Sequence, residues 1–401
     1  MTDPAFEAAA WSWVEHLRSG GTTTWRAWRA TEHEPVQPRW PLLPTGAQLE
    51  VVRLLAAWES SSQGHPDDTF ATVADRVSRT PVGGRGLLDP VLPWSPATTA
   101  GAPEIEPDEL PVGELLRVCV AAIDGWFLDQ ATARGVPQRP RRRPRRPAFV
   151  VAGVSPHAES VRRALLDAGH LEGGHRPTAL VVGGPLDAMA TMLWRRRVER
   201  GAGIRWRRLW AGLAARRVLP AALDLVAVAD SWVLQVGADR VHVIVQRDPA
   251  AAVRDAGHVL GIASAPARPW TPDVVGTDLL RRLNQSLAIR GPETTRRLLE
   301  SPLGQAFFQG LHIAENHPLG VPLPQLPWAL EQAEALAVRL AAGAFTVHGD
   351  PRVVVPSSDP AMPRSVDPRD TLSSALLVLA SCERLAQVTA RMSRTMREGR
   401  S

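Results

Sequence analysis

The pattern of apolar and polar positions is helical in the first third of the chain. Apolar residues recur at helical spacing at Leu49, Val52 and Ala56. Arg53 and Glu59 fall off this stripe, so we expect both to face solvent. The same spacing predicts a mostly helical N-terminal region. The expected helices span residues 4–17, 46–58, 68–77 and 110–130.

From residue 148 onward, short apolar runs alternate with helical segments. The runs are rich in Val and are bounded by Gly or by polar residues, which is typical of buried strands. They lie at 148–153, 178–184 and 240–246, with a possible fourth at 345–348. Strands that alternate with helices predict a parallel sheet covered on both faces. We therefore expect an α/β fold with a short parallel sheet flanked by helices.

A tract of arginine and proline separates these two patterns. It reads RPRRRPRRP and should be extended and solvated, because proline lacks an amide donor and like charges repel. We place a domain boundary there. The predicted organisation is a helical region at 1–138, a linker at 139–147, an α/β domain at 148–356, and a loop with an amphipathic helix at 357–401.

The net charge depends on that one tract. The 401-residue chain has a formal charge of +5, and the tract holds six Arg and no acid, so the remainder carries 5 − 6 = −1. All 46 basic residues are Arg, since the sequence contains no Lys. This excludes mechanisms that need a phosphate-binding Lys, a Schiff base or a Ser-Lys dyad.

The cysteines and the apolar runs bear on the compartment. Cys119 and Cys382 both lie in apolar helical stretches, so we expect buried free thiols, and two cysteines are too few for a cysteine-based zinc site. The first residues carry no basic region followed by an apolar stretch, and we expect no signal peptide. The apolar run at 223–236 contains acids. We therefore expect a cytoplasmic protein without a membrane span.

The turn after the first predicted strand is the leading candidate for a cofactor or anion site. It reads GVSPHAES, and Gly153, Ser155, His157 and Ser160 are its candidate binding residues. Such a turn can hold a phosphate on the amides of a helix N-terminus. It lacks Lys and a second Gly, and Pro156 removes one donor. The alternative is an ordinary strand-to-helix turn with Ser155 as N-cap.

Residues 148–356 resemble the sulfotransferase family, particularly its actinobacterial type. The resemblance rests on the order and spacing of five segments. They read FVVAGVSPHAES, ALVVGGPLDAMATMLWRRR, RVHVIV, DLLRRLN and GAFTVHGDPRVVVP. The resemblance implies a P-loop-related α/β fold and, in active members, use of the sulfate donor 3′-phosphoadenosine-5′-phosphosulfate (PAPS).

The departures from the family fall on its catalytic motifs. Where the family has a Lys-Thr-Gly-Thr-Thr type sequence, residues 156–160 read PHAES, and only Gly153 and Ser160 match. The family's Arg and Ser for the 3′-phosphate correspond here to Gly184 and Met192. The interval between Gly169 and Pro177 is too short for an acceptor-binding region with its base. The resemblance therefore implies a sulfotransferase fold with a degenerate active site.

Three functional hypotheses follow. The first is a protein without a cofactor that binds an anionic small molecule or a protein partner and transfers no group. The second is an active PAPS-dependent sulfotransferase in which Arg162, Arg163 or an Arg from elsewhere in the chain replaces the missing Lys. The third is nucleic-acid binding through the Arg/Pro tract and the basic tail. We do not favour the third, because the tract has no interleaved aromatic residue on which bases stack.

Histidines and tryptophans provide weaker candidates. Histidines cluster at 170–175 and 312–317, but neither cluster has the HExxH spacing of a zinc site, and we expect no metal. His348 lies near a strand end, where α/β sites sit, and is a candidate contact. The Trp-rich segment 13–28 predicts two helices joined by a capped turn, with a binding loop as the alternative.

Overall fold

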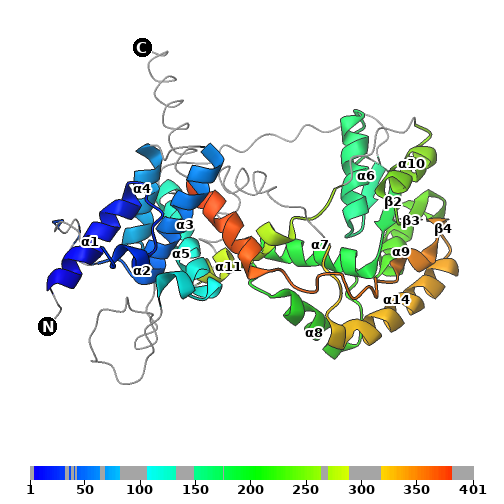
Figure 1. The fold of residues 1–401 in the computed structure, drawn as a ribbon. Coiled ribbons are helices and arrows are strands. Elements are labelled where there is room, and N and C mark those ends of the chain that lie inside the picture. The colour runs from blue at the N-terminus through cyan, green and yellow to red at the C-terminus, as the bar shows by residue number, and fades with distance from the viewer. Residues whose placement is uncertain are drawn as a thin grey trace, which may run out of the picture. The chain divides into compact units, whose positions relative to one another are not determined.

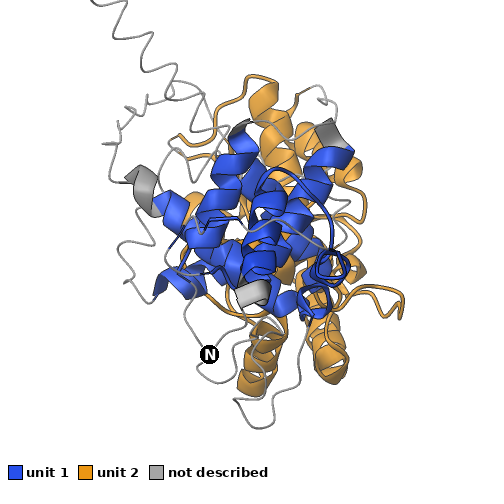
Figure 2. Cartoon of the chain, turned by 60° about the vertical axis from the view of Figure 1, so that its left-hand side comes forward, with its two compact units in different colours: residues 1–135, 282–313, 367–401 blue, residues 136–281, 314–366 orange. Residues whose placement is uncertain are grey.

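The computed structural model describes most of both predicted regions. The described residues are 4–31, 36–37, 40, 43–63, 68–81, 106–131, 149–174, 176–262, 270–288 and 318–381. The chain divides into two compact units (Figure 2). Unit 1 comprises residues 1–135, 282–313 and 367–401, and unit 2 comprises 136–281 and 314–366.

This division differs in detail from the predicted domains. Residues 282–313 group with the helical unit, and 357–366 group with the α/β unit. The predicted linker at 139–147 lies outside the described residues, as do Cys382 and the part of the predicted C-terminal helix beyond residue 381.

Unit 1 is helical where it is described, as predicted. Its helices are α1 (Pro4–Arg18), α2 (Trp25–Trp28), α3 (Gly46–Gln63), α4 (Asp68–Arg79) and α5 (Val112–Ala131), and residues 368–381 form a further helix. Leu49, Val52 and Ala56 are buried, as the periodicity indicates. The prediction for the polar positions was wrong. Glu59 is buried, and Arg53 forms an ion pair with Glu50 (2.6 Å).

The Trp-rich segment is a packed helix–turn–helix. Trp13 Nε1 donates to the carbonyl of Thr23 (3.0 Å), and the rings of Trp13 and Trp25 lie 5.2 Å apart. Thr24 caps α2 by accepting from the amide of Ala27. The capped turn expected from the sequence is therefore present.

Unit 2 is built on a four-stranded parallel sheet. Its strands are β1 (Phe149–Ala152), β2 (Thr178–Gly183), β3 (Val241–Val245) and β4 (Thr346–Gly349), in the order β1-β2-β3-β4. In register, Val151 pairs with Leu180, and Leu180 pairs with His242. The predicted parallel sheet, including the possible fourth strand, is confirmed.

Helices cover both faces of this sheet (Figure 1). On one face, α6 (Pro156–Asp167) and α10 (Pro249–Leu260) pack on a core that includes Val161, Leu180 and Ile244. On the other face lie α9 (Leu225–Val236) and α14 (Leu326–Ala341). Gly183 admits the close approach of α9, because a Cβ there would lie 2.2 Å from Leu225 Cδ1.

The remaining elements in the described ranges are helical. They are α7 (Leu186–Glu199), α8 (Trp206–Arg216), α11 (Val274–Leu287), and the 3-10 helices η2 (Pro107–Glu109), η3 (Ala238–Arg240), η5 (Leu323–Gln325) and η6 (Pro351–Val354). A series of tryptophan rings joins α7, α8 and α14. Successive ring centroids are 5.8, 5.7 and 6.4 Å apart along Trp194, Trp206, Trp210 and Trp328.

Two predictions about the chain's environment can be compared with the structure. Among the described helices, none combines the length and the apolar character needed to cross a bilayer. Cys119 is a buried free thiol, as expected, and burial raises the pKa of its thiol.

Candidate functional site

The carboxyl ends of the four strands define the candidate site. In an open parallel sheet, ligands bind beyond these ends, at the point where the strand order reverses. The described strands run β1-β2-β3-β4 without such a reversal. Helix α6 follows β1, α7 follows β2 and α10 follows β3, so each N-terminus lies close to the carboxyl end of a strand.

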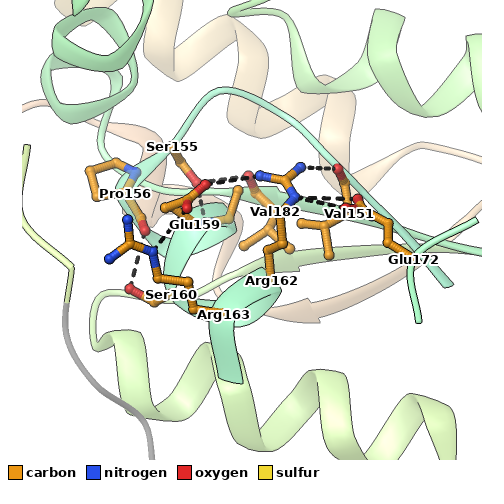
Figure 3. A network of polar contacts seen from close by, with 10 residues as sticks. Val151, Ser155, Pro156, Glu159, Ser160, Arg162, Arg163, Glu172 and Val182 are labelled. Carbon is orange, nitrogen blue, oxygen red and sulfur yellow. Dashed lines mark hydrogen bonds and ion pairs between the residues drawn. The ribbon is translucent and has the colours of Figure 1, made fainter. Parts of the chain in front are cut away.

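The turn between β1 and α6 has the conformation of a tight strand-to-helix connection (Figure 3). Gly153 adopts a φ of +105°, and a Cβ there would lie 2.6 Å from the carbonyl oxygen of Val182. Ser155 Oγ donates to the same carbonyl (2.9 Å) and accepts from the amide of Ala158 (3.0 Å). The serine thus joins the turn to β2 and caps α6.

The second candidate hydroxyl is also engaged. Ser160 Oγ donates to the carbonyl of Pro156 (3.2 Å) and accepts from the amide of Trp270 (3.0 Å). Ser155 and Ser160 are each only 1% exposed. Both side chains therefore hold the turn and its neighbours in place.

Few backbone amides are left at the start of α6. Pro156 has no N–H, the amide of Ala158 donates to Ser155 Oγ, and that of Glu159 donates to the Ser155 carbonyl (3.4 Å). The first four N–H groups of a helix are the ones that can bind an anion. The amide of Glu159 makes the first bond within the helix, so the four positions are Ser155 to Ala158. Two of them, Pro156 and Ala158, lack a donor or already use it.

His157 contributes no fixed positive charge. Its side chain is buried, and burial lowers the pKa of the imidazole, although the carbonyls of Gly183 and Gln246 and the charge of Asp248 oppose the shift. The ring is therefore neutral near pH 7. It also occupies space beside Gly184, where a Cβ would lie 3.2 Å from His157 Nδ1.

The arginines expected to replace a phosphate-binding Lys are paired (Figure 3). Arg162 contacts Glu159 (3.0 Å) and Glu172 (3.1 Å), and its Nη2 donates to the carbonyl of Val151 (2.8 Å). Arg163 Nε contacts the other oxygen of Glu159 (3.0 Å). Both guanidinium groups are thus directed to carboxylates of the protein.

Carboxylates of the protein also lie at the N-termini of α7, α9 and α10. Asp187 accepts from the amide of Ala188 (3.0 Å), is 2% exposed, and has a pKa raised to about 6 by burial. Asp224 caps α9 through two amides, and Asp248 caps α10 in the same way. A helix N-terminus favours negative charge, and here the chain supplies that charge itself.

The structure brings together two histidines that the sequence left separate. His242 Nδ1 lies 3.2 Å from His348 Nε2, across β3 and β4. Burial and the neighbouring His348 lower the pKa of His242. The signal was present in the sequence, because both histidines fall on predicted strands, but the pairing depends on the register of those strands.

The other histidines give no metal site in the described residues. His170 follows α6, and its amide donates to the carbonyl of Leu165 (3.0 Å). His175 and the segment 312–317 lie outside the described residues. Within the described part of the chain, no group of three or more His, Cys, Asp or Glu side chains is arranged to hold a metal ion.

Comparison of the chain with protein-family models, with curated proteins and with solved structures found no match. Buried hydroxyls, a neutral imidazole and helix termini occupied by carboxylates can position backbone and exclude water. They offer little that would neutralise a polyanionic cofactor.

Proposed function

We propose that the chain is a non-catalytic binding protein with a sulfotransferase-like α/β unit, and that its ligand is an anionic small molecule or a protein partner. One observation carries the proposal. The turn between β1 and α6 has the position of a phosphate-binding loop, but both of its hydroxyls are bonded within the protein, and Pro156 and Ala158 offer no amide to a ligand.

Electrostatics supports the same conclusion. A nucleotide cofactor with several phosphates needs cations or free amides to offset the loss of water around its charges. The turn provides the neutral His157, while Asp187 and Asp248 place negative charge at the neighbouring helix N-termini. These carboxylates would repel the phosphates of PAPS rather than stabilise them.

The active-enzyme alternative would require Arg162 to change partners. Its guanidinium donates to Glu159, Glu172 and the Val151 carbonyl, so binding a phosphate would leave these acceptors without a donor. The nucleic-acid alternative depends on the tract at 139–147, which lies outside the described residues.

A paired binding and transfer assay tests the proposal. The full chain is incubated with labelled PAPS and a panel of hydroxyl and amine acceptors, and its thermal unfolding is followed with adenosine 3′,5′-bisphosphate and with ATP. We expect no transfer of label and no rise in Tm with either nucleotide. A ligand at 100 times its Kd would add about 2.7 kcal/mol to the unfolding free energy, which raises Tm by several degrees.

Arg162→Gln provides the matched variant. If the wild-type chain transfers label and Arg162→Gln does not, the guanidinium acts as the phosphate-binding cation, and the proposed function is wrong. A Tm rise with the bisphosphate in the wild type that disappears in the variant contradicts it in the same way.

A further inference from the structure

Trp270 is surrounded by arginines from two helices of unit 2. Arg163 of α6 places its Cζ 5.5 Å from the centroid of the Trp270 ring, and Arg195 of α7 places its Cζ at 4.9 Å. The backbone amide of Trp270 donates a hydrogen bond to Ser160 Oγ. Cations at these distances interact favourably with the indole face, so the arrangement brings both guanidinium groups to one side chain.

Two N–H donors at this place are buried without an acceptor. They are Arg195 Nη1 and Trp270 Nε1, and neither has a hydrogen-bond partner in the structure. Buried donors are nearly always paired in folded proteins, because leaving one unpaired costs about 1–3 kcal/mol. Arg195 Nη1 and Trp270 Nε1 lie on side chains in contact, so a ligand with several acceptor atoms could satisfy both of them.

Both guanidinium groups beside Trp270 also form an ion pair with a carboxylate. Arg195 pairs with Glu199 (2.6 Å), and Arg163 pairs with Glu159 (3.0 Å). The Arg195 pair is made through Nε, so it leaves Arg195 Nη1 without an acceptor.

We infer that the Trp270 cluster, defined as Arg163, Arg195 and Trp270, binds an oxyanion of the phosphate or sulfate class. Such an anion presents several oxygens, so it can accept from both Arg195 Nη1 and Trp270 Nε1. The inference rests on the proposed function, whose ligand it specifies as a phosphate or sulfate group. It places that group beside Trp270 rather than on the amides of α6.

Anion binding to the full chain tests this inference. Titration calorimetry is performed with inorganic phosphate, inorganic sulfate and the monoester glycerol phosphate, with ionic strength held constant by chloride. Binding of the inorganic ions alone assigns the site to the free anion. Tighter binding of the monoester assigns it to a phosphorylated metabolite. Both outcomes support the cluster as the site, provided that the variants below reduce the affinity.

The variants separate a built site from non-specific ion effects. Trp270→Phe removes the indole N–H and keeps an aromatic ring, while Arg195→Gln removes the guanidinium group with its unpartnered Nη1. We expect each to weaken phosphate binding at least tenfold. Arg254→Gln is the matched control, because Arg254 is exposed and only weakly paired with Asp248 (3.9 Å). We expect it to bind like the wild type.

Two outcomes of the titrations would contradict the inference. Equal binding by the wild type and the two cluster variants, or no binding above the chloride background, overturns the inference and assigns the orphan donors to buried water. Arg195→Gln keeps the test open if Trp270→Phe fails to fold, since the Arg195 side chain is only partly buried and its ion pair with Glu199 lies within one helix. Transfer of label from PAPS would contradict the proposed function but leave phosphate binding at Trp270 intact, so the two failures are distinguishable.

Discussion

Ser155, His157 and Ser160 show how burial decides the role of a polar residue. Their side chains are those that a phosphate-binding turn would use, but the two hydroxyls bond to Val182, Ala158, Pro156 and Trp270. A hydroxyl has one proton to donate, so a serine that already donates to a carbonyl has none for a ligand. The distinction lies in the partners, and two of them, Val182 and Trp270, are remote in sequence.

Asp187 carries a prediction about pH. Its pKa is raised from an ordinary value of 3.8 to about 6 in the folded state, so the folded protein binds this proton more tightly than the unfolded chain. The contribution of this raised pKa to the unfolding free energy is fully present below pH 3.8, and it is lost as pH rises through about 6. Asp187→Asn removes this dependence because the amide does not titrate.

The measurement compares urea unfolding of the two proteins at pH 7.5 and pH 5. When the pH falls, we expect the unfolding free energy of the wild type to rise by about 1–2 kcal/mol relative to that of Asp187→Asn. The rise of the Asp187 pKa from 3.8 to about 6 implies a change of this size. Taking the difference between the proteins cancels the opposite contributions of His157 and His242, whose lowered pKa values favour folding at higher pH. A constant difference at both pH values would contradict the prediction.

At the scale of elements, the edge of the sheet is covered. β1 lies at the end of the strand order, and the segment after α6 bridges to it at Phe149 and Glu172. The amide of Gly173 donates to the Phe149 carbonyl (2.9 Å), and Glu172 accepts from the amide of Val151 (3.1 Å). These contacts satisfy backbone groups that would otherwise be open to another chain.

Glu172→Ala tests this edge. It removes the acceptor for the Val151 amide and one ion pair of Arg162, so we expect the unfolding free energy to fall by about 1–2 kcal/mol. The urea midpoint measures the loss. Glu331→Ala on the exposed face of α14 is the control and should change it by less than about 0.5 kcal/mol. Equal urea midpoints for the two variants would show that the contacts of Glu172 with the edge strand β1 do not stabilise the protein.

Most elements could be predicted because their signals are local. Val-rich runs and helical spacing located all four strands, and Ser155 with Pro156 marked the start of α6. Burial of Glu59 was missed because helical periodicity assumes that a charged side chain faces water. The His242–His348 contact was missed because no local pattern specifies which residues face each other on two strands.

At the scale of the whole molecule, each unit combines segments that are distant in sequence. Unit 1 includes residues 282–313 and 367–401, and unit 2 resumes at 314–366. Composition placed one boundary near the Arg/Pro tract, but it could not reveal that the chain returns to unit 1. Such groupings depend on long-range contacts, which periodicity within a segment does not encode.

The Arg/Pro tract carries the prediction at this scale. Deleting residues 139–147 changes the formal charge from +5 to −1. We expect the wild type to bind a random duplex only weakly and to lose binding steeply as salt rises, because six arginines release counterions from the phosphates. The deletion should abolish this binding while leaving Tm unchanged.

Fluorescence anisotropy between 50 and 300 mM salt measures both effects. Binding that survives the deletion, or that prefers one sequence at high salt, would contradict a purely electrostatic association. It would instead favour a nucleic-acid function located elsewhere in the chain.

The sequence by itself determined the class of fold, the positions of its strands and the exclusion of mechanisms that need a lysine. These depend on residue type and on spacing along one segment. The tertiary structure alone decided which donors and acceptors are already used. It paired Arg162 with Glu172 and engaged the serine hydroxyls of the turn in hydrogen bonds within the protein. It also left Arg195 and Trp270 each with an N–H group that has no acceptor. Hydrogen bonding is a property of distance and direction in space, and the partners involved lie up to 110 residues apart.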